Sequence, residues 1–256
     1  MIRRLKRALG INFSSKALRR NPGICLRQYL RRFRSFPELA AELTSRGPVT
    51  LVQVGANDGS ANDPLARLIE DHPGAIDRAL LIEPQTAAFE RLTAHHRDNP
   101  SIHCLNAAID RTAGTRTIWS IDREAVQARL GRPMSDGIAS FERNHVIQVL
   151  VQNGVAEGDV PSLLTHESVE LATLGGAARS VGIGNPDILL VDTEGFDAEI
   201  MHMAFDAGWL PKLLQYEHKH LSPSERRELA VRLRAAGYVL WADHADVWGQ
   251  LGGQSD

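Results

Sequence analysis

The chain has 256 residues, of which 43% are hydrophobic and 23% charged, a composition typical of a soluble globular protein that excludes a disordered, collagen-like or coiled-coil chain. No apolar stretch approaches the ~18 residues of a membrane span, and the two cysteines, Cys25 and Cys104, do not suffice for a disulfide framework, so we expect an intracellular protein. The net charge of −2 hides an asymmetry: residues 1–34 contain eleven Lys or Arg and no acid, which leaves −13 on the remainder.

The basic N-terminal segment is expected to be a helical arm, which we assign to residues 1–46. Its apolar residues follow the spacing of one helix face, at Leu26, Tyr29, Leu30 and Phe33. Three interpretations are open: a lid packed on the rest of the protein, a peripheral contact of residues 1–34 with an anionic membrane, and a targeting or nucleic-acid-binding segment.

Residues 47–256 are expected to form one domain, because short apolar runs alternate with amphipathic helices from Pro48 onward. The predicted strands are Val49–Val54, Ala79–Ile82, Ile102–Leu105, Ile188–Val191, Leu213–Tyr216 and, as the last, Tyr238–Ala242. The predicted helices are Asn62–Asp71, one through Phe89 and Leu92, Ala198–Ala207 and Ser224–Ala236. This order predicts an α/β fold whose mostly parallel sheet has helices on both faces, with ligands beyond the carboxyl ends of the strands.

Residues 110–186 interrupt that alternation with turn sequences such as Gly131-Arg132-Pro133 and Ser135-Asp136-Gly137. We expect this region to be an insertion that covers the substrate side, with a helix at Glu142–Gln152.

The first predicted strand ends in Val52-Gln53-Val54-Gly55-Ala56-Asn57-Asp58-Gly59. Gly55 would allow a tight turn, and Gly59 would let the backbone approach a ligand. Asn57 stands where a dinucleotide fingerprint has its middle glycine, which disfavours a pyrophosphate and favours a nucleoside with an amino-acid tail. Alternatively, Asn57 is simply a left-handed turn residue.

Two further strand ends add to this loop. Glu83 ends the second strand, where a carboxylate can accept hydrogen bonds from both ribose hydroxyls; its structural alternative is a cap for a helix beginning at Pro84. At the third strand end, Asn106 and Ala107 begin a segment that could frame an adenine.

Taken in order, these motifs resemble the FkbM family of class I S-adenosylmethionine-dependent methyltransferases. The resemblance spans about residues 49–244 and rests on the residues 52–59, Ile-Glu-Pro-Gln (82–85), Asn-Ala-Ala-Ile (106–109), Ser140-Phe141, the segment 187–197 and Tyr216-Glu217-His218.

The resemblance implies a Rossmann-like sheet and S-adenosylmethionine as the cofactor. It implies that Gly55, Asn57 and Gly59 hold the methionine end of the cofactor and Glu83 its ribose. Gln53 stands where many relatives carry an acid. Acceptors in this family include hydroxyls of sugars, glycans and polyketides.

The fourth and fifth strand ends carry the candidate catalytic residues. Asp192 and His218 are our candidates for a general base that takes the proton of an acceptor hydroxyl. In the alternative, Asp192 and Glu194 hold a divalent metal ion; we predict no metal as the main interpretation. For Asp197 we expect a helix N-cap. His218 and His220 lie on one face if the chain is extended there, but zinc would need more ligands.

The sequence therefore predicts a cytoplasmic O-methyltransferase, at most peripheral to the inner face of a membrane, that acts on a sugar, glycan, glycolipid or polyketide-type hydroxyl. The alternatives are an NAD-dependent oxidoreductase, which the missing glycine disfavours, and a non-catalytic, membrane-associated nucleotide-binding module. Nucleic acid is disfavoured because the body is acidic.

Overall fold

The computed structural model describes residues 33–59, 64–132, 134 and 138–252. Residues 1–32 of the predicted N-terminal arm therefore lie outside the described residues, as do the first two residues of the predicted helix Asn62–Asp71 and the turn at 135–137. None of the helices in these ranges has both the length and the apolar character needed to cross a bilayer.

In the described part of the chain, seven strands form the main sheet, in the order β10-β11-β9-β8-β1-β2-β3. They are β1 (Val49–Val54), β2 (Ile76–Ile82), β3 (Ile102–Leu105), β8 (Ile188–Val191), β9 (Leu213–Glu217), β10 (Tyr238–Ala242) and β11 (Asp246–Leu251). The pairs between β3 and β9 are parallel, whereas β11 runs antiparallel to both its neighbours. The mostly parallel sheet is thus confirmed, but Tyr238–Ala242 is not the last strand.

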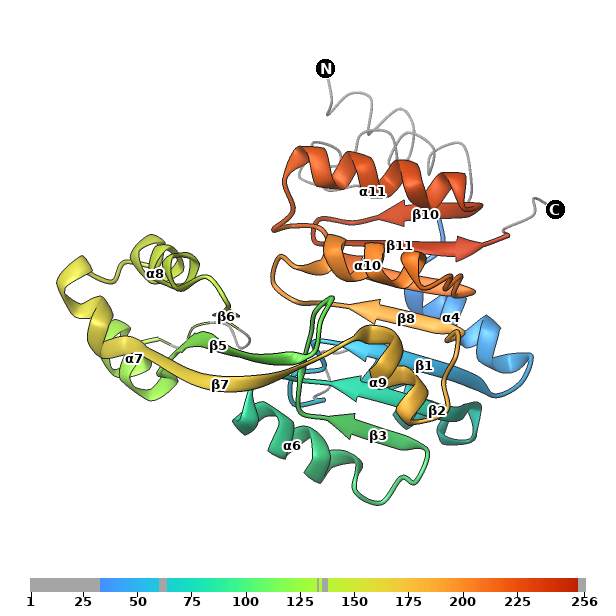
Figure 1. Cartoon of the computed structure of the whole chain (residues 1–256), viewed down its shortest axis with the longest axis horizontal. Helices are drawn as coiled ribbons and strands as arrows, with labels where there is room; N and C mark the ends of the chain where they lie inside the picture. The colour runs from blue at the N-terminus through green and yellow to red at the C-terminus, as the bar shows by residue number, and fades with distance from the viewer. Residues whose placement is uncertain (1–32, 60–63, 133, 135–137, 253–256) are drawn as a thin grey trace.

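Helices cover both faces of this sheet, as its continuous apolar strands require. The side chains of α9 (Leu174–Ser180), α10 (Asp197–Asp206) and α11 (Pro223–Ala235) pack on one face. Those of α4 (Phe36–Ser45), α5 (Pro64–Asp71) and α6 (Thr86–His96) pack on the other, and the 3₁₀ helix η1 (Pro73–Ala75) leads into β2. Figure 1 shows α9 and α10 in front of the strands.

Helix α4 is part of this packed body, although it lies within the segment that we assigned to the arm. It begins with a capping box between Ser35 and Glu38. Phe36 and Leu39 are then 3% and 1% exposed in the core beneath β1. Arg34, just before this capping box, is also held in place, because the indole Nε1 of Trp248 donates a hydrogen bond to its carbonyl at 2.9 Å.

The predicted insertion forms a cap, which in the described residues consists of a smaller sheet, β4-β7-β5-β6, and helices on it. Its elements are β4 (Ala108–Ile109), β5 (Gly114–Ile121), α7 (Arg123–Leu130), β6 (Ala139–Ser140), α8 (Arg143–Gln152), η2 (Glu157–Leu163) and β7 (Leu164–Ala172). The predicted helix at Glu142–Gln152 is confirmed as α8. The cap has its own core, in which Val126, Val146 and Leu150 are fully buried.

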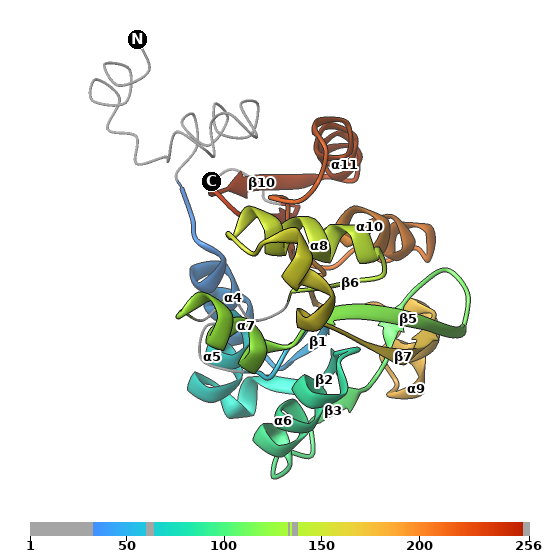
Figure 2. The same cartoon turned by 90° about the vertical axis from the view of Figure 1, so that its left-hand side faces the viewer.

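The insertion is shorter than the predicted 110–186, because α9 returns to the main sheet. Leu174 and Ala178 of this helix are buried against strands of the main sheet. In Figure 1 the arrows of β1, β2 and β8 point toward the cap, and Figure 2 looks onto the cap from that side. The cap therefore faces the carboxyl ends of the parallel strands, where ligands of such sheets bind.

We predict that Leu39→Ala lowers the free energy of unfolding of the whole protein by about 2–5 kcal/mol, because it opens a cavity beneath β1. Urea unfolding followed by circular dichroism measures this change. Val231→Ala, at a position that is 58% exposed on α11, serves as the control and is expected to change stability by less than about 0.5 kcal/mol. A Leu39→Ala variant as stable as this control would show that α4 is dispensable for the body.

Candidate functional site

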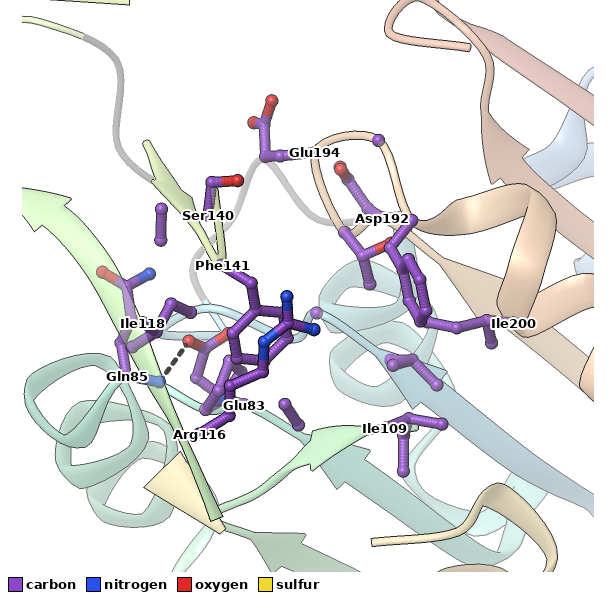
Figure 3. A pocket seen from close by; sticks show the side chains of 18 of the residues that line it. Glu83, Gln85, Ile109, Arg116, Ile118, Ser140, Phe141, Asp192, Glu194 and Ile200 are labelled. Carbon is purple, nitrogen blue, oxygen red and sulfur yellow. Dashed lines mark hydrogen bonds between the residues drawn. The ribbon is translucent and has the colours of Figure 1, made fainter. Parts of the chain in front are cut away.

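A cavity of about 470 Å³ lies between the main sheet and the cap, within the range of small-molecule sites. Its sheet side is formed by residues after β1 (Gly55 and Asn57), after β2 (Glu83–Gln85), after β3 (Ala107) and after β8 (Asp192–Phe196). Its cap side is formed by Arg116, Ile118, Ala139–Glu142 and His145. Figure 3 shows side chains from both sides converging on this space.

The loop after β1 is fixed by its backbone. Gly55 has φ +84°, and a Cβ at this position would lie 1.8 Å from the carbonyl oxygen of Asp192, so only glycine fits between β1 and the loop after β8. Asn57 has φ +49°, as its interpretation as a left-handed turn residue required. Gly59 does not line the cavity: its Cα faces α6, where a Cβ would meet Leu92 at 2.9 Å. We expected Gly59 to let the backbone approach a ligand, but in the structure it lets the loop pack closely against α6.

Glu83 joins this loop to the end of β2. Its side chain is 4% exposed, and its two carboxylate oxygens accept hydrogen bonds from the backbone N–H groups of Asn57 and Gln85, each at 2.9 Å. Figure 3 shows the bond from Gln85. Burial raises the pKa of Glu83, and the two backbone hydrogen bonds counter part of that rise. Helix α6 starts only at Thr86, with Gln85 as its N-cap, so Glu83 does not cap a helix at Pro84.

Of the remaining residues that we predicted to bind the cofactor, one lines the cavity and two lie behind its wall. Ala107 lines the cavity. Asn106 lies behind the wall, where its side-chain amide donates to the carbonyls of Glu83 and Pro84. Gln53 is 3% exposed and also lies off the wall. The Oδ1 atom of Asn57 is buried, and no hydrogen-bond donor among the described residues reaches it.

Asp192 lies on another wall of the cavity, at the end of β8 (Figure 3). Its side chain is exposed toward the cavity, although many protein atoms lie around it and desolvate it. This desolvation, together with the nearby carboxylates of Glu217, Asp197 and Glu194, raises the pKa of Asp192 to about 8. The Asp192 carboxylate therefore binds a proton much more readily than an ordinary surface aspartate does.

Asp197 is fully buried and holds the loop after β8 in place. Its carboxylate accepts hydrogen bonds from the N–H and hydroxyl of Thr193, from the N–H of Gly195 and from the N–H of Glu217. Burial and then the charge of Glu217 raise its pKa to about 7, against the lowering effect of the bond from Thr193. Asp197 is itself the first residue of α10, so the expected N-cap role is wrong: it ties the loop to β9 instead.

The histidine that lines the cavity is His220, two residues after the predicted His218. His218 is fully buried and does not line the cavity, so it cannot contact an acceptor in this conformation. His220 lines the cavity, and its Nε2 lies 2.8 Å from Oε2 of Glu194. His145 of the cap helix α8 lies edge-on to it, with ring centroids 6.0 Å apart. The His-Lys-His sequence made both imidazoles candidates for the site. Which of them faces the cavity depends on the turn that follows the end of β9 at Glu217.

We predict a pH effect from His96, which is 7% exposed and packs under the loop after β1 beside Gly59. Burial, and then the charge of His95, lowers the pKa of His96. Below its ordinary pKa of about 6.5, the unfolded chain takes up a proton that the folded chain resists, so stability is lost as pH falls. Between about pH 7.5 and pH 5, the melting temperature of His96→Asn is therefore expected to fall less than that of the wild type.

Differential scanning fluorimetry at the two pH values provides the measurement, and His103→Asn at an exposed position on β3 is the matched control. The control is expected to follow the wild type. Equal losses in all three proteins would remove His96 as the cause.

Comparison with known proteins supports the fold. No protein-family model and no curated protein matches the chain. Among solved structures, the FkbM methyltransferase of Methylobacillus flagellatus KT superposes with a TM-score of 0.50 at 13% identity, over 95% of this chain and 57% of that one. The METTL16 methyltransferase domain (TM-score 0.44, 10% identity, 96% of this chain and 75% of that one) and Aeropyrum pernix fibrillarin with bound S-adenosyl-L-methionine (0.41, 11%, 82% and 73%) are more distant.

The chain spans little more than half of the FkbM structure, and the low identity makes this a statement about the fold. The predicted likeness is confirmed at that level: the chain has the Rossmann-like α/β fold of an FkbM methyltransferase, with a mostly parallel sheet and helices on both of its faces.

Proposed function

We propose that the protein is an S-adenosylmethionine-dependent O-methyltransferase. The observation that carries the proposal is Glu83, a buried carboxylate on the cavity wall whose two oxygens are each held by one backbone N–H. A carboxylate has about four acceptor positions, so two are left for the hydroxyls of a ribose. Its position at the carboxyl end of β2, next to the glycine turn after β1, is where nucleoside ligands of such sheets place their ribose.

The loop after β1 fits a nucleoside with an amino-acid tail better than a dinucleotide. A pyrophosphate needs glycine where its backbone contact is closest, and Asn57 occupies that place with a side chain on the cavity wall. The buried Oδ1 of Asn57 has no hydrogen-bond donor among the described residues, so it could accept a hydrogen bond from the ammonium of a methionine tail. Ala107 adds a small residue beside the place proposed for the adenine.

S-Adenosylmethionine, when bound, would supply an electrophilic methyl group on its sulfonium. The chain then has to orient an acceptor hydroxyl and remove its proton. Asp192 is the residue that we propose for the proton, because its carboxylate lies on the cavity wall at the end of β8 while Glu83 lies at the end of β2. Orientation alone can lower such a barrier by roughly 7–11 kcal/mol, and a general base adds about 10²–10⁴-fold.

The cap side of the cavity supports an acceptor with both apolar and hydroxyl-bearing surface, such as a sugar, glycan, glycolipid or polyketide-type metabolite. Phe141 offers a ring, and the Arg116 guanidinium stacks 4.4 Å from its centre. Ser140, Glu142 and His145 add polar groups on the same side. These residues come from the inserted cap, so we assign acceptor choice to it.

Isothermal titration calorimetry of S-adenosylhomocysteine and of NAD tests the cofactor assignment. The wild type is expected to bind S-adenosylhomocysteine and not NAD. Glu83→Ala is expected to bind it at least tenfold more weakly, because a hydrogen bond to a charged group contributes about 1.5–3 kcal/mol. Glu90→Ala, at an exposed position on α6, is expected to bind like the wild type.

Glu83→Ala also loses the link between two loops, so its fold is checked by circular dichroism, and Glu83→Gln provides a second variant of similar size. NAD binding that depends on Glu83 would favour the oxidoreductase. If the folded wild type binds neither ligand, the catalytic proposal fails and a role through residues 1–34 at a membrane gains weight.

A further inference from the structure

Beside the cavity, Glu194, Glu217 and His220 bring three potential metal ligands together. Among the described residues, one carboxylate oxygen of each glutamate and one ring nitrogen of His220 lie within 4.8 Å of one another. His220 Nε2 is 2.8 Å from Glu194 Oε2 and 3.6 Å from Glu217 Oε2. The three residues come from the loop after β8, the end of β9 and the turn that follows β9.

Glu217 shows that this cluster is incomplete. Its side chain is only 5% exposed. Oε1 is 2.5 Å from the ammonium of Lys219, but Oε2 is buried and finds no hydrogen-bond partner in the described part of the chain. A buried carboxylate oxygen without a donor is costly unless a cation or a donor approaches it. The unsatisfied atom is the one that lies toward His220.

Glu217 also lies within a cluster of carboxyl groups that has Lys219 and His220 beside it. Lys219 is 3.8 Å from Glu194 in addition to its contact with Glu217. The carboxyl groups of Asp192 and Asp197 are close enough to both the cluster and each other to interact electrostatically with Glu217. Four carboxyl groups, those of Asp192, Glu194, Asp197 and Glu217, thus lie near Lys219 and His220, and this arrangement favours the uptake of further positive charge.

We propose that Glu194, Glu217 and His220 bind a divalent cation that accepts both oxygen and imidazole ligands, of the Mn²⁺ or Zn²⁺ kind. Ligands at about 2.1 Å from one ion lie at most ~4.2 Å apart. The distances of 2.8 and 3.6 Å already meet this limit, and the third pair of ligand atoms, from Glu194 and Glu217, lies within 4.8 Å. Lys219 contacts Oε1 of Glu217, whereas Oε2 is the oxygen that lies toward His220.

The ion's position relative to the cavity gives it a role. Glu194 and His220 line the cavity, whereas Glu217 lies behind them. An ion held by all three would therefore have its open coordination positions toward the cavity, where it would bind an acceptor oxygen and lower the pKa of that hydroxyl. This role rests on the proposed methyl transfer, but the binding of the ion does not.

Electron paramagnetic resonance of Mn²⁺ tests the site without any activity assay, because the signal of free Mn²⁺ falls as the ion binds. The full-length protein is first treated with EDTA and exchanged into metal-free buffer. We expect one Mn²⁺ per chain, with Glu217→Gln and His220→Ala weakening the affinity at least tenfold. Glu228→Gln, at an exposed position on α11, is the matched control and is expected to bind like the wild type.

Circular dichroism and the melting temperature show whether each variant is folded, and Lys219→Met gives a test that removes no ligand. Loss of the nearby ammonium is expected to tighten Mn²⁺ binding severalfold. If Mn²⁺ binds only to Lys219→Met, the lysine is the cation of this cluster and the proposal is overturned. Wild-type binding that Glu217→Gln and His220→Ala leave unchanged would overturn it as well.

Discussion

The close approach of three loops at the carboxyl ends of β1, β2 and β8 is the constraint on which the site depends. Gly55 has to be glycine because the carbonyl of Asp192 occupies the space of a side chain. The N–H of Gly55 bonds to the carbonyl of Ile82, and the N–H of Asn57 bonds to Glu83. The loops are therefore positioned by backbone contacts. Glu83 and Asp192 consequently take fixed places on the walls of one cavity.

A second feature of the molecule is the concentration of carboxylates behind that cavity. Asp197 holds its charge with four hydrogen bonds from the loop after β8 and from β9, so it contributes rigidity. Glu217 is satisfied on one oxygen only. The same burial that positions these groups also makes their negative charges costly, which links the structure of the loop after β8 to its capacity to bind a cation or a proton.

Most of the main sheet was predictable from the sequence because its strands are continuous apolar runs such as Ile188–Val191, buried on both faces. Strand β11 was missed because Asp246–Leu251 mixes polar residues and Gly249 into a short segment that pairs antiparallel. Helix α9 was missed because Gly175 and Gly176 in its first turn resemble a loop. The Ser35–Glu38 capping box of α4 was a readable signal within a segment that we assigned to the arm.

The candidate site was predictable where a residue follows directly from a strand end, as for Gly55, Glu83 and Asp192. It was not predictable where a turn decides which side chain faces the cavity, as for His218 and His220. The wall formed by the cap, and the place of Glu217 in the proposed metal site, depend on contacts between segments far apart in the sequence.

A nucleoside cofactor held in the cavity by Glu83 is the core of the proposed function, and a crystal structure of the protein with S-adenosylhomocysteine tests it most directly. We predict that both ribose hydroxyl oxygens lie within hydrogen-bond distance of the Glu83 carboxylate. A ligand bound outside this cavity, or one whose ribose points away from Glu83, would contradict it.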